Sequence, residues 1–309
     1  MTRPQPSGPP RLVLVFTLLS VLLAACGQAA PGAAPATAPT EAAATAPTAA
    51  EEASSDSDLL ADVRSRGTLV ISSDPNYAPQ SFKNSDGSWE GFDIDVGREI
   101  AKRLGVEAEF VDISFDVITA GSWNGRWDIN VGSMTVTGPR QEVLYFSAPY
   151  YYAPAAFVVH QDSTAAAVSD LAGKNIGVGA ATTYLDYLNN SLTLEGEEIA
   201  VPAPEGATST VYDTDLLAIE DLKLGDGTRL DAVLTALPTA QNAINEGAPL
   251  KILGDPVFFE QLAVALDRQS PLDSQALATE ISTIIEAMRA DGTLKALSEQ
   301  YYTVDLTSK

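Results

Sequence analysis

Residues suited to covalent or metal chemistry are scarce in this sequence of 309 residues. It has one Cys, Cys26, and one His, His160, so an internal disulfide and a His/Cys metal cluster are both excluded. A Ser-His-Asp hydrolase would have to use His160 as its base. Carboxylate-based calcium sites stay open on this count, because Asp and Glu together number 41. We expect no catalytic residue, no metal and no cofactor.

The charge of the chain limits its partners. Eighteen basic residues stand against 41 acidic ones, a net charge of -23. Such a surface repels phosphate backbones, so we expect no nucleic acid partner. In so acidic a protein, a cleft arginine would let an anion approach, and Arg140 could fork onto a carboxylate through its planar guanidinium. The residues alone fit equally well with Arg140 in an ion pair on a helix surface.

The N-terminus predicts export. Arg3 and Arg11 precede an apolar run of 14 residues, Leu12–Ala25, which as a helix spans about 21 Å, less than the ~30 Å core of a membrane. Residues 1–25 are therefore predicted to be a signal peptide. The run ends Leu-Ala-Ala-Cys, which resembles the bacterial lipobox, and we expect Cys26 to carry lipid that anchors the protein to the outer face of the cell membrane. The alternative is an ordinary secretory peptide with a chance cysteine.

The segment after Cys26 predicts a tether. Of the 29 residues from Ala29 to Ser57, 13 are Ala, 4 Pro and 4 Thr, a composition that cannot build a core. Residues 26–57 are thus expected to link the lipid to a folded part that begins near Asp58.

Strand and helix patterns alternate through the folded part. The first series comprises Thr68–Ser72 (strand), Phe92–Leu104 (helix), Ala108–Val111 (strand), Phe115–Trp123 (helix) and Asp128–Val131 (strand). A second series comprises Asn175–Val178 (strand), a helix from Thr182, Glu198–Val201 (strand), Thr214–Leu222 (helix) and Leu230–Thr235 (strand). The end comprises Leu262–Leu266 (strand) and helices at about Asp273–Ala290 and Thr293–Tyr302. Two similar series predict two α/β lobes with a ligand cleft between them.

One motif resembles the signature of a particular protein family. Gly91-Phe92-Asp93-Ile94-Asp95-Val96 leads into the helix that ends at Leu104-Gly105, and it resembles the signature of family 3 of the bacterial extracellular solute-binding proteins, receptors of ABC importers for polar amino acids. The physical role expected of the motif is an N-capped amphipathic helix with acids in its first turn. The resemblance extends over nearly all of Leu60 to Leu306.

The resemblance implies a type II periplasmic-binding-protein fold, with two α/β lobes joined by a two-strand hinge. Lobe 1 would comprise residues 58–153 plus 258–309, and lobe 2 residues 154–257. The hinge would lie near Tyr152–Ala155 and Asp255–Val257, and the lobes would close on the ligand. We expect a monomer that delivers its ligand to an ABC transporter permease.

The resemblance also implies a site. Arg140 and Thr135 would bind the ligand carboxylate, with a backbone group of Gly132 beside them and Ser133 in the same stretch. Thr182 and Thr183, at a helix start where Ala181 replaces the usual Gly, would bind its other oxygen. The remaining predicted ligand-binding residues are Asp74, Tyr77, Phe115 and Thr235.

One departure affects the ligand. Amino acid receptors of this family place an Asp for the α-ammonium where this chain has Ala236. Either another acid serves, with Asp74 as the candidate, or the ligand is a carboxylate without a free α-amine. The predicted function is capture of an amino acid or related small carboxylate, and the alternative is a dehydratase-like enzyme of the same fold.

Overall fold

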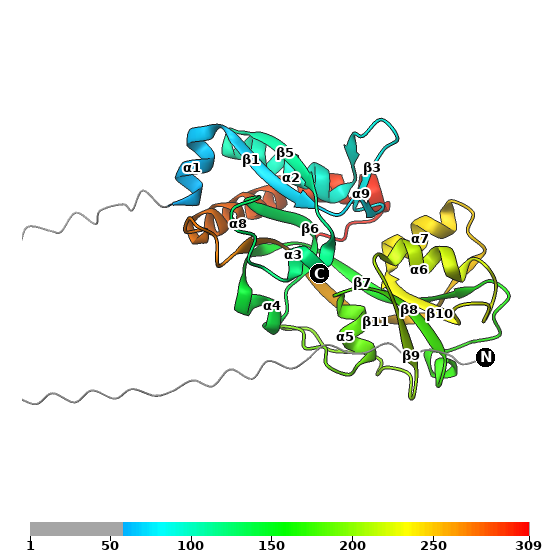
Figure 1. Cartoon of the computed structure of the whole chain (residues 1–309). Helices are drawn as coiled ribbons and strands as arrows, with labels where there is room; N and C mark the ends of the chain where they lie inside the picture. Colours follow the sequence, from blue (N-terminus) through cyan, green and yellow to red (C-terminus); the bar gives the residue numbers. More distant parts are fainter. Residues whose placement is uncertain (1–57, 309) are drawn as a thin grey trace, which may run out of the picture. The chain divides into compact units, whose positions relative to one another are not determined.

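The computed structural model describes residues 58–308, whose elements form a mixed α/β fold around one curled sheet (Figure 1). Across the sheet the strands run β5 (Glu107–Asp112), β1 (Thr68–Ser73), β6 (Ile129–Thr135), β11 (Leu250–Asp267), β7 (Leu144–His160), β10 (Ala232–Ala236), β8 (Asn175–Gly179) and β9 (Thr208–Tyr212). A small antiparallel sheet contains β2 (Asn76–Tyr77), β3 (Ser81–Lys83) and β4 (Trp89–Glu90). The helices are α1 (Leu59–Arg66), α2 (Phe92–Leu104), α3 (Phe115–Thr119), α4 (Gly138–Val143), α5 (Thr183–Leu188), α6 (Asp215–Leu222), α7 (Leu237–Asn245), α8 (Gln275–Ala290) and α9 (Thr293–Tyr302), with a 3₁₀ turn at Val168–Leu171.

Two long antiparallel strands form the centre of the sheet. β7 and β11 pair from Leu144 with Asp267 at one end to His160 with Leu250 at the other, with register shifts between. Parallel strands β6, β1 and β5 extend the sheet beyond β11, and parallel strands β10, β8 and β9 extend it beyond β7. In Figure 1 the two long strands run from the α1, α2 and α8 group to the α6 and α7 group.

Apolar side chains gather in clusters that follow this division. One cluster joins the early chain to its end, from Leu59 to Ala153 and again from Leu262 to Leu294. Two others are built wholly from buried residues between Ala155 and Phe258. Burial of apolar surface is the main stabilising contribution to each cluster.

The start of α2 depends on Gly91. This residue has φ 127°, and a Cβ at its position would lie 2.2 Å from the carbonyl oxygen of Gln80, so only glycine fits. Gly91 has no side chain to cap the helix, which departs from the expected N-cap. Asp93 in the first turn is fully buried rather than solvated, and it accepts hydrogen bonds from Tyr150 and Ser133. The motif therefore ties α2 to the strands beneath it.

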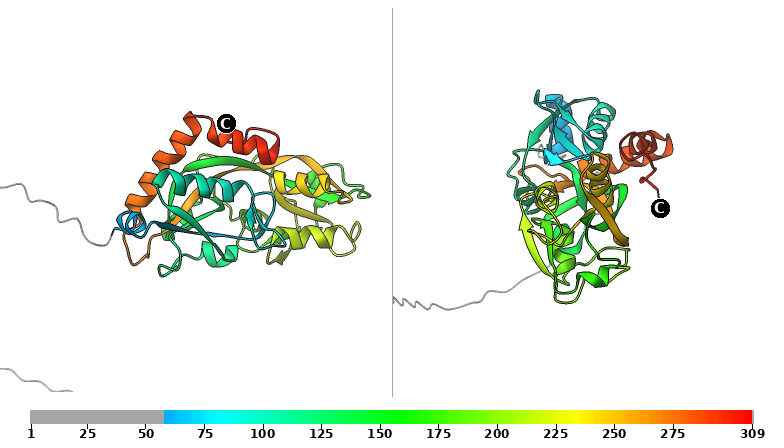
Figure 2. Two further views of the ribbon diagram at one scale, coloured as in Figure 1. Left: turned by 90° about the horizontal axis from the view of Figure 1, so that it is seen from above. Right: turned by 90° about the vertical axis from the view of Figure 1, so that its right-hand side faces the viewer.

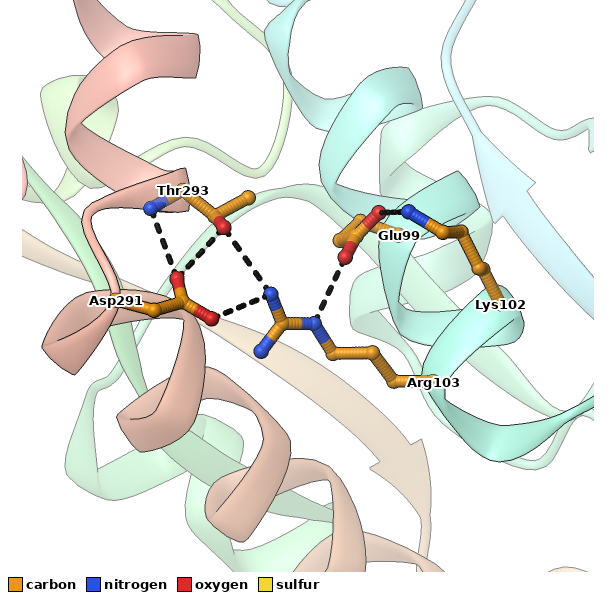
Figure 3. A network of polar contacts seen from close by, with 5 residues as sticks. All are labelled: Glu99, Lys102, Arg103, Asp291 and Thr293. Carbon is orange, nitrogen blue, oxygen red and sulfur yellow. Dashed lines mark hydrogen bonds and ion pairs between the residues drawn. The ribbon is translucent and has the colours of Figure 1, made fainter.

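The end of the chain returns to α2. Helices α8 and α9 pack against it, as Figure 2 shows. Arg103, in the last turn of α2, joins them: its Nε donates to Glu99 at 2.8 Å, and its Nη2 donates to Asp291 at 2.8 Å and Thr293 at 3.1 Å (Figure 3). Lys102 donates to the same Glu99. Because Lys102 and Asp291 are exposed and Arg103 and Glu99 are only partly buried, solvent screens this network, and its role is to orient the returning chain more than to stabilise it.

The α/β pattern expected from the sequence is present, with some differences in extent. No strand forms at 198–201, where Ile199 is 43% exposed, and the strand that pairs with β8 is β9. The helix expected over Phe115–Trp123 ends at Thr119. The expected strand Leu262–Leu266 is one part of the much longer β11.

Candidate functional site

A cavity opens where the ends of β1, β6 and β8 approach β11. Including its mouth and the open solvent there, the empty space is about 550 Å³. Nine of the ten residues predicted to bind ligand line it: Asp74, Tyr77, Phe115, Gly132, Ser133, Thr135, Arg140, Thr182 and Thr183. The further lining residues are Asn76, Ser81, Gly179, Ala180, Tyr184, Asp213, Thr214, Asp215 and Glu260.

Arg140 is the basic residue of this cavity. Thr137 and Pro139 begin α4 and set Arg140 in its first turn, where the side chain is buried. Nη1 donates to the carbonyl of Thr135 at 3.0 Å and Nη2 to that of Ala181 at 2.8 Å. The guanidinium carbon lies 5.4 Å from the ring centroid of Phe115. Within residues 58–308 no carboxylate pairs with this guanidinium, so the arrangement differs from a surface ion pair.

Burial makes the charge of Arg140 costly. It lowers the pKa of the guanidinium, while the nearby carboxylates of Glu260 and Asp186 raise it. A buried cation without a paired anion is the arrangement expected where a ligand supplies the anion.

The loop before α5 meets Arg140 from the other group of elements. Ala181 has φ 58°, a left-handed conformation that glycine adopts more easily, which fits the glycine that the family resemblance implies here. Thr182 caps α5, since its Oγ1 accepts from the N–H of Leu185, and the same hydroxyl donates to the carbonyl of Gly179 at 2.8 Å. The cap places the Thr183 side chain toward β11.

Glu260, which sequence reasoning missed, lies at the centre of the site. It is 2% exposed on β11. Its Oε1 accepts from the hydroxyls of Thr135, at 2.6 Å, and Thr183, and its Oε2 accepts from Tyr184 at 2.8 Å. All three donors are neutral. The available signal was a charged residue within the mostly apolar stretch Val-Phe-Phe-Glu-Gln-Leu-Ala-Val.

Two more buried carboxylates face the cavity. Asp74, 9% exposed after β1, accepts from the N–H of Asn76 at 2.8 Å, and burial raises its pKa. Asp215 begins α6, and burial raises its pKa to about 7, although it accepts from the N–H of Gly179 and from the hydroxyl of Thr235. Thr235 itself is fully buried behind Asp215 and does not line the cavity, so it is placed to position that carboxylate.

Ser133 lines the cavity with its hydroxyl already occupied. The residue has φ 52°; its N–H donates to the Tyr150 hydroxyl at 2.9 Å and its Oγ to Asp93 at 2.7 Å. The hydroxyl of Tyr151 lies 2.6 Å from the same Oγ. This network holds the chain between Gly132 and Thr135 against the cavity.

Tyr77 lines the cavity, and burial, together with the charges of Asp215 and Glu260, raises the pKa of its hydroxyl well above the ordinary value. In the part of the chain described, no set of three His, Cys, Asp or Glu residues could hold a metal ion.

Among residues 58–308, no helix has the length and apolar character of a membrane span. Cys26 and the predicted signal peptide and tether lie outside the described residues.

Comparison with known proteins identifies relatives. The model of the bacterial extracellular solute-binding proteins, family 3, matches residues 69–304. The L-cystine-binding protein TcyJ of Escherichia coli K12 is 29% identical over 256 residues, 82% of this chain and 89% of that protein. Two solved structures share the fold. An ancestral arginine-binding protein bound to arginine has a TM-score of 0.65 and 30% identity, covering 77% of this chain and 99% of its own. An ancestral amino acid-binding protein, described as a precursor of cyclohexadienyl dehydratase, has a TM-score of 0.67 and 27% identity, covering 79% and 99%.

Proposed function

Because the chain belongs to family 3 of the bacterial extracellular solute-binding proteins, we propose that it captures an amino acid and delivers it to the permease of an ABC importer. The observation that carries the proposal is Arg140, a buried guanidinium that faces a cavity without a paired carboxylate. The cited relatives bind amino acids, by description cystine in one case and arginine in another. Arg140 would bind the ligand carboxylate with the fork that lysine lacks.

The same proposal assigns two lobes, residues 58–153 plus 258–309 and residues 154–257, with a hinge near Tyr152–Ala155 and Asp255–Val257. The division of the apolar clusters supports these boundaries, since buried residues between Ala155 and Phe258 form clusters of their own. Arg140, on one side, donates to Ala181 on the other. Ligand binding would therefore hold the lobes together.

Binding by the native state alone can be detected as stabilisation. A ligand at 100 times its Kd adds about 2.7 kcal/mol to the free energy of unfolding. We expect one or a few amino acids from a full panel to raise the melting temperature of the full chain, and to reduce the radius of gyration in solution scattering. No response to any amino acid would refute the proposed ligand class, and a tight ligand that leaves the radius unchanged would refute closure.

Transport and anchoring need tests in cells. Deletion of the gene should lower uptake of the radiolabelled amino acid, and reintroduction should restore it. A fatty-acid probe should label the wild-type chain but not Cys26→Ser, because Cys26 is proposed as the lipidated residue that places the protein at the outer face of the cell membrane. Equal labelling of both would refute lipidation at Cys26. We propose that the protein acts as a monomer.

An enzyme remains a second candidate for one reason, the structural relative described as a precursor of a dehydratase. Asp215 and Glu260 would be its acid and base, since both carboxylates face the cavity. Incubation of the full chain with cyclic and linear carboxylic acids, followed by product analysis, separates the two functions. A receptor binds its ligand and returns it unchanged.

A further inference from the structure

The cavity contains more negative than positive charge. Arg140 is the one basic residue among the described residues that line it, whereas four acids do so: Asp74, Asp213, Asp215 and Glu260. A ligand carboxylate would neutralise Arg140 and leave the acids without a counterion. Carboxylates in a closed cleft are costly unless a cation pairs with them.

Glu260 is the acid best placed for such a cation. Asp215 is already held by the backbone of Gly179 and by Thr235, and Asp74 by the backbone of Asn76. Glu260 accepts only from side-chain hydroxyls, which can rotate to admit another donor. It is almost completely buried, and no basic residue among 58–308 pairs with it.

The position of Glu260 relative to Arg140 fits an α-amino acid. Arg140 donates to the backbone carbonyl of Thr135, and Glu260 accepts from the hydroxyl of the same residue. Thr135 therefore contacts both the proposed carboxylate site and the proposed ammonium site, so the two sites are adjacent. An α-amino acid carries its carboxylate and its ammonium on the same α-carbon, so its two groups are adjacent in the same way.

The sheet explains how Glu260 can replace the acid absent at Ala236. Ala236 ends β10 and is 1% exposed, outside the cavity lining. It pairs with Ala155 on β7, and Ala155 pairs on its other side with Phe258 of β11. Glu260 lies two residues beyond Phe258, so its side chain leaves the same face of the sheet as Phe258, from β11, which is separated from β10 by β7.

We propose that Glu260 binds the α-ammonium of the ligand in place of the missing acid, and that the ligand is an α-amino acid with a cationic side chain. The second cation would be received by Asp74 and Asp215, which both line the cavity; the charges of Glu260 and Asp74 add to burial in raising the pKa of Asp215. This inference rests on the proposed function and names its ligand class.

The test uses calorimetry on the full chain with L-lysine and 6-aminohexanoate, which is lysine without the α-ammonium. Wild type should bind L-lysine more tightly than 6-aminohexanoate and than L-glutamine. Glu260→Gln should weaken L-lysine binding by at least about 30-fold, because a buried charge pair loses one partner, and leave 6-aminohexanoate within about 3-fold. The matched control is Asp267→Asn, another buried acid on β11, which lies outside the cavity and should change neither affinity.

Several outcomes would overturn the inference. Equal losses for both ligands in Glu260→Gln, or no loss for L-lysine, would remove Glu260 from the ammonium site. Tighter binding of L-glutamine than of L-lysine by wild type would refute the cationic side chain while leaving an amino acid receptor intact. Binding of no amino acid at all would instead refute the proposed function. If Glu260→Gln unfolds below the assay temperature, Glu260→Asp is measured in its place, and it should weaken only L-lysine binding.

Discussion

Replacement of Arg140 by alanine tests the carboxylate site. In the unliganded protein the change removes two charge-assisted hydrogen bonds, to the carbonyls of Thr135 and Ala181. Such bonds contribute about 1.5–3 kcal/mol each, but the buried guanidinium is itself costly, as its lowered pKa shows. We expect the free energy of unfolding to fall by only about 1–2 kcal/mol, so that the variant folds.

Ligand binding should suffer more than stability. Loss of the buried partner of the ligand carboxylate should weaken the free energy of binding by roughly 3–5 kcal/mol, which raises Kd about 150-fold to several thousand-fold. Arg140→Lys should not restore affinity, because Nη1 and Nη2 of the arginine serve two separate carbonyls and an ammonium cannot reproduce that geometry. Isothermal calorimetry with the amino acid found in the thermal panel measures both variants.

Arg126→Ala is the matched control. Its guanidinium carbon lies 4.6 Å from the ring centroid of Trp127, and its Nε donates to the carbonyl of Trp123, yet it lies outside the cavity lining. Its affinity should stay within about 3-fold of wild type. Full affinity in Arg140→Ala, or equal losses in Arg126→Ala, would refute the assignment of Arg140.

Two further predictions concern stability. Burial raises the pKa of Asp93 from 3.8 to about 7. The stability that the protonated carboxyl contributes is therefore complete below about pH 4 and is lost as the pH rises to about 7. Asp93→Asn should make the free energy of urea unfolding less dependent on pH between about 5 and 8. An unchanged pH profile would show that another group is responsible. Gly91→Ala should lower the free energy of urea unfolding by about 3 kcal/mol, because the new Cβ would collide with the backbone of Gln80. The control is Gly87→Ala, where φ is also positive but nothing lies within 4 Å of the new Cβ. It should cost about 1 kcal/mol in the same urea experiment. Equal losses would contradict the steric argument.

Sequence patterns predicted those elements whose apolar faces are buried. Helix α2, with a regular stripe and glycines at both ends, has the predicted bounds. β9 was missed because three of its five residues are exposed and its sequence, Thr-Ser-Thr-Val-Tyr, has no alternating apolar face. The segment Glu198–Val201 looked more like a strand, yet its backbone is held by Val257 instead of by a sheet neighbour. Edge strands carry a weak pattern because one side faces solvent.

The candidate site shows a similar limit. Residues that follow strands β1, β6 and β8 were predictable, because parallel strands bring their carboxyl ends to one edge. Glu260 was not, since its place depends on the register shifts of β11 against β7. Neither motif spacing nor composition contains that register. Thr235 was predicted to bind ligand, but the depth of β10 places it behind Asp215.

The return of the chain end to α1 and α2 has a consequence for biosynthesis. Arg64 donates to Glu280, 216 positions later, and the core that begins at Leu59 also requires Leu294. The chain is synthesised from its N-terminus to its C-terminus, so that core stays incomplete until α8 and α9 have been made. The clusters between Ala155 and Phe258 need no later residue. The segment made second is therefore expected to acquire its tertiary structure first, and the segment made first must wait for the last.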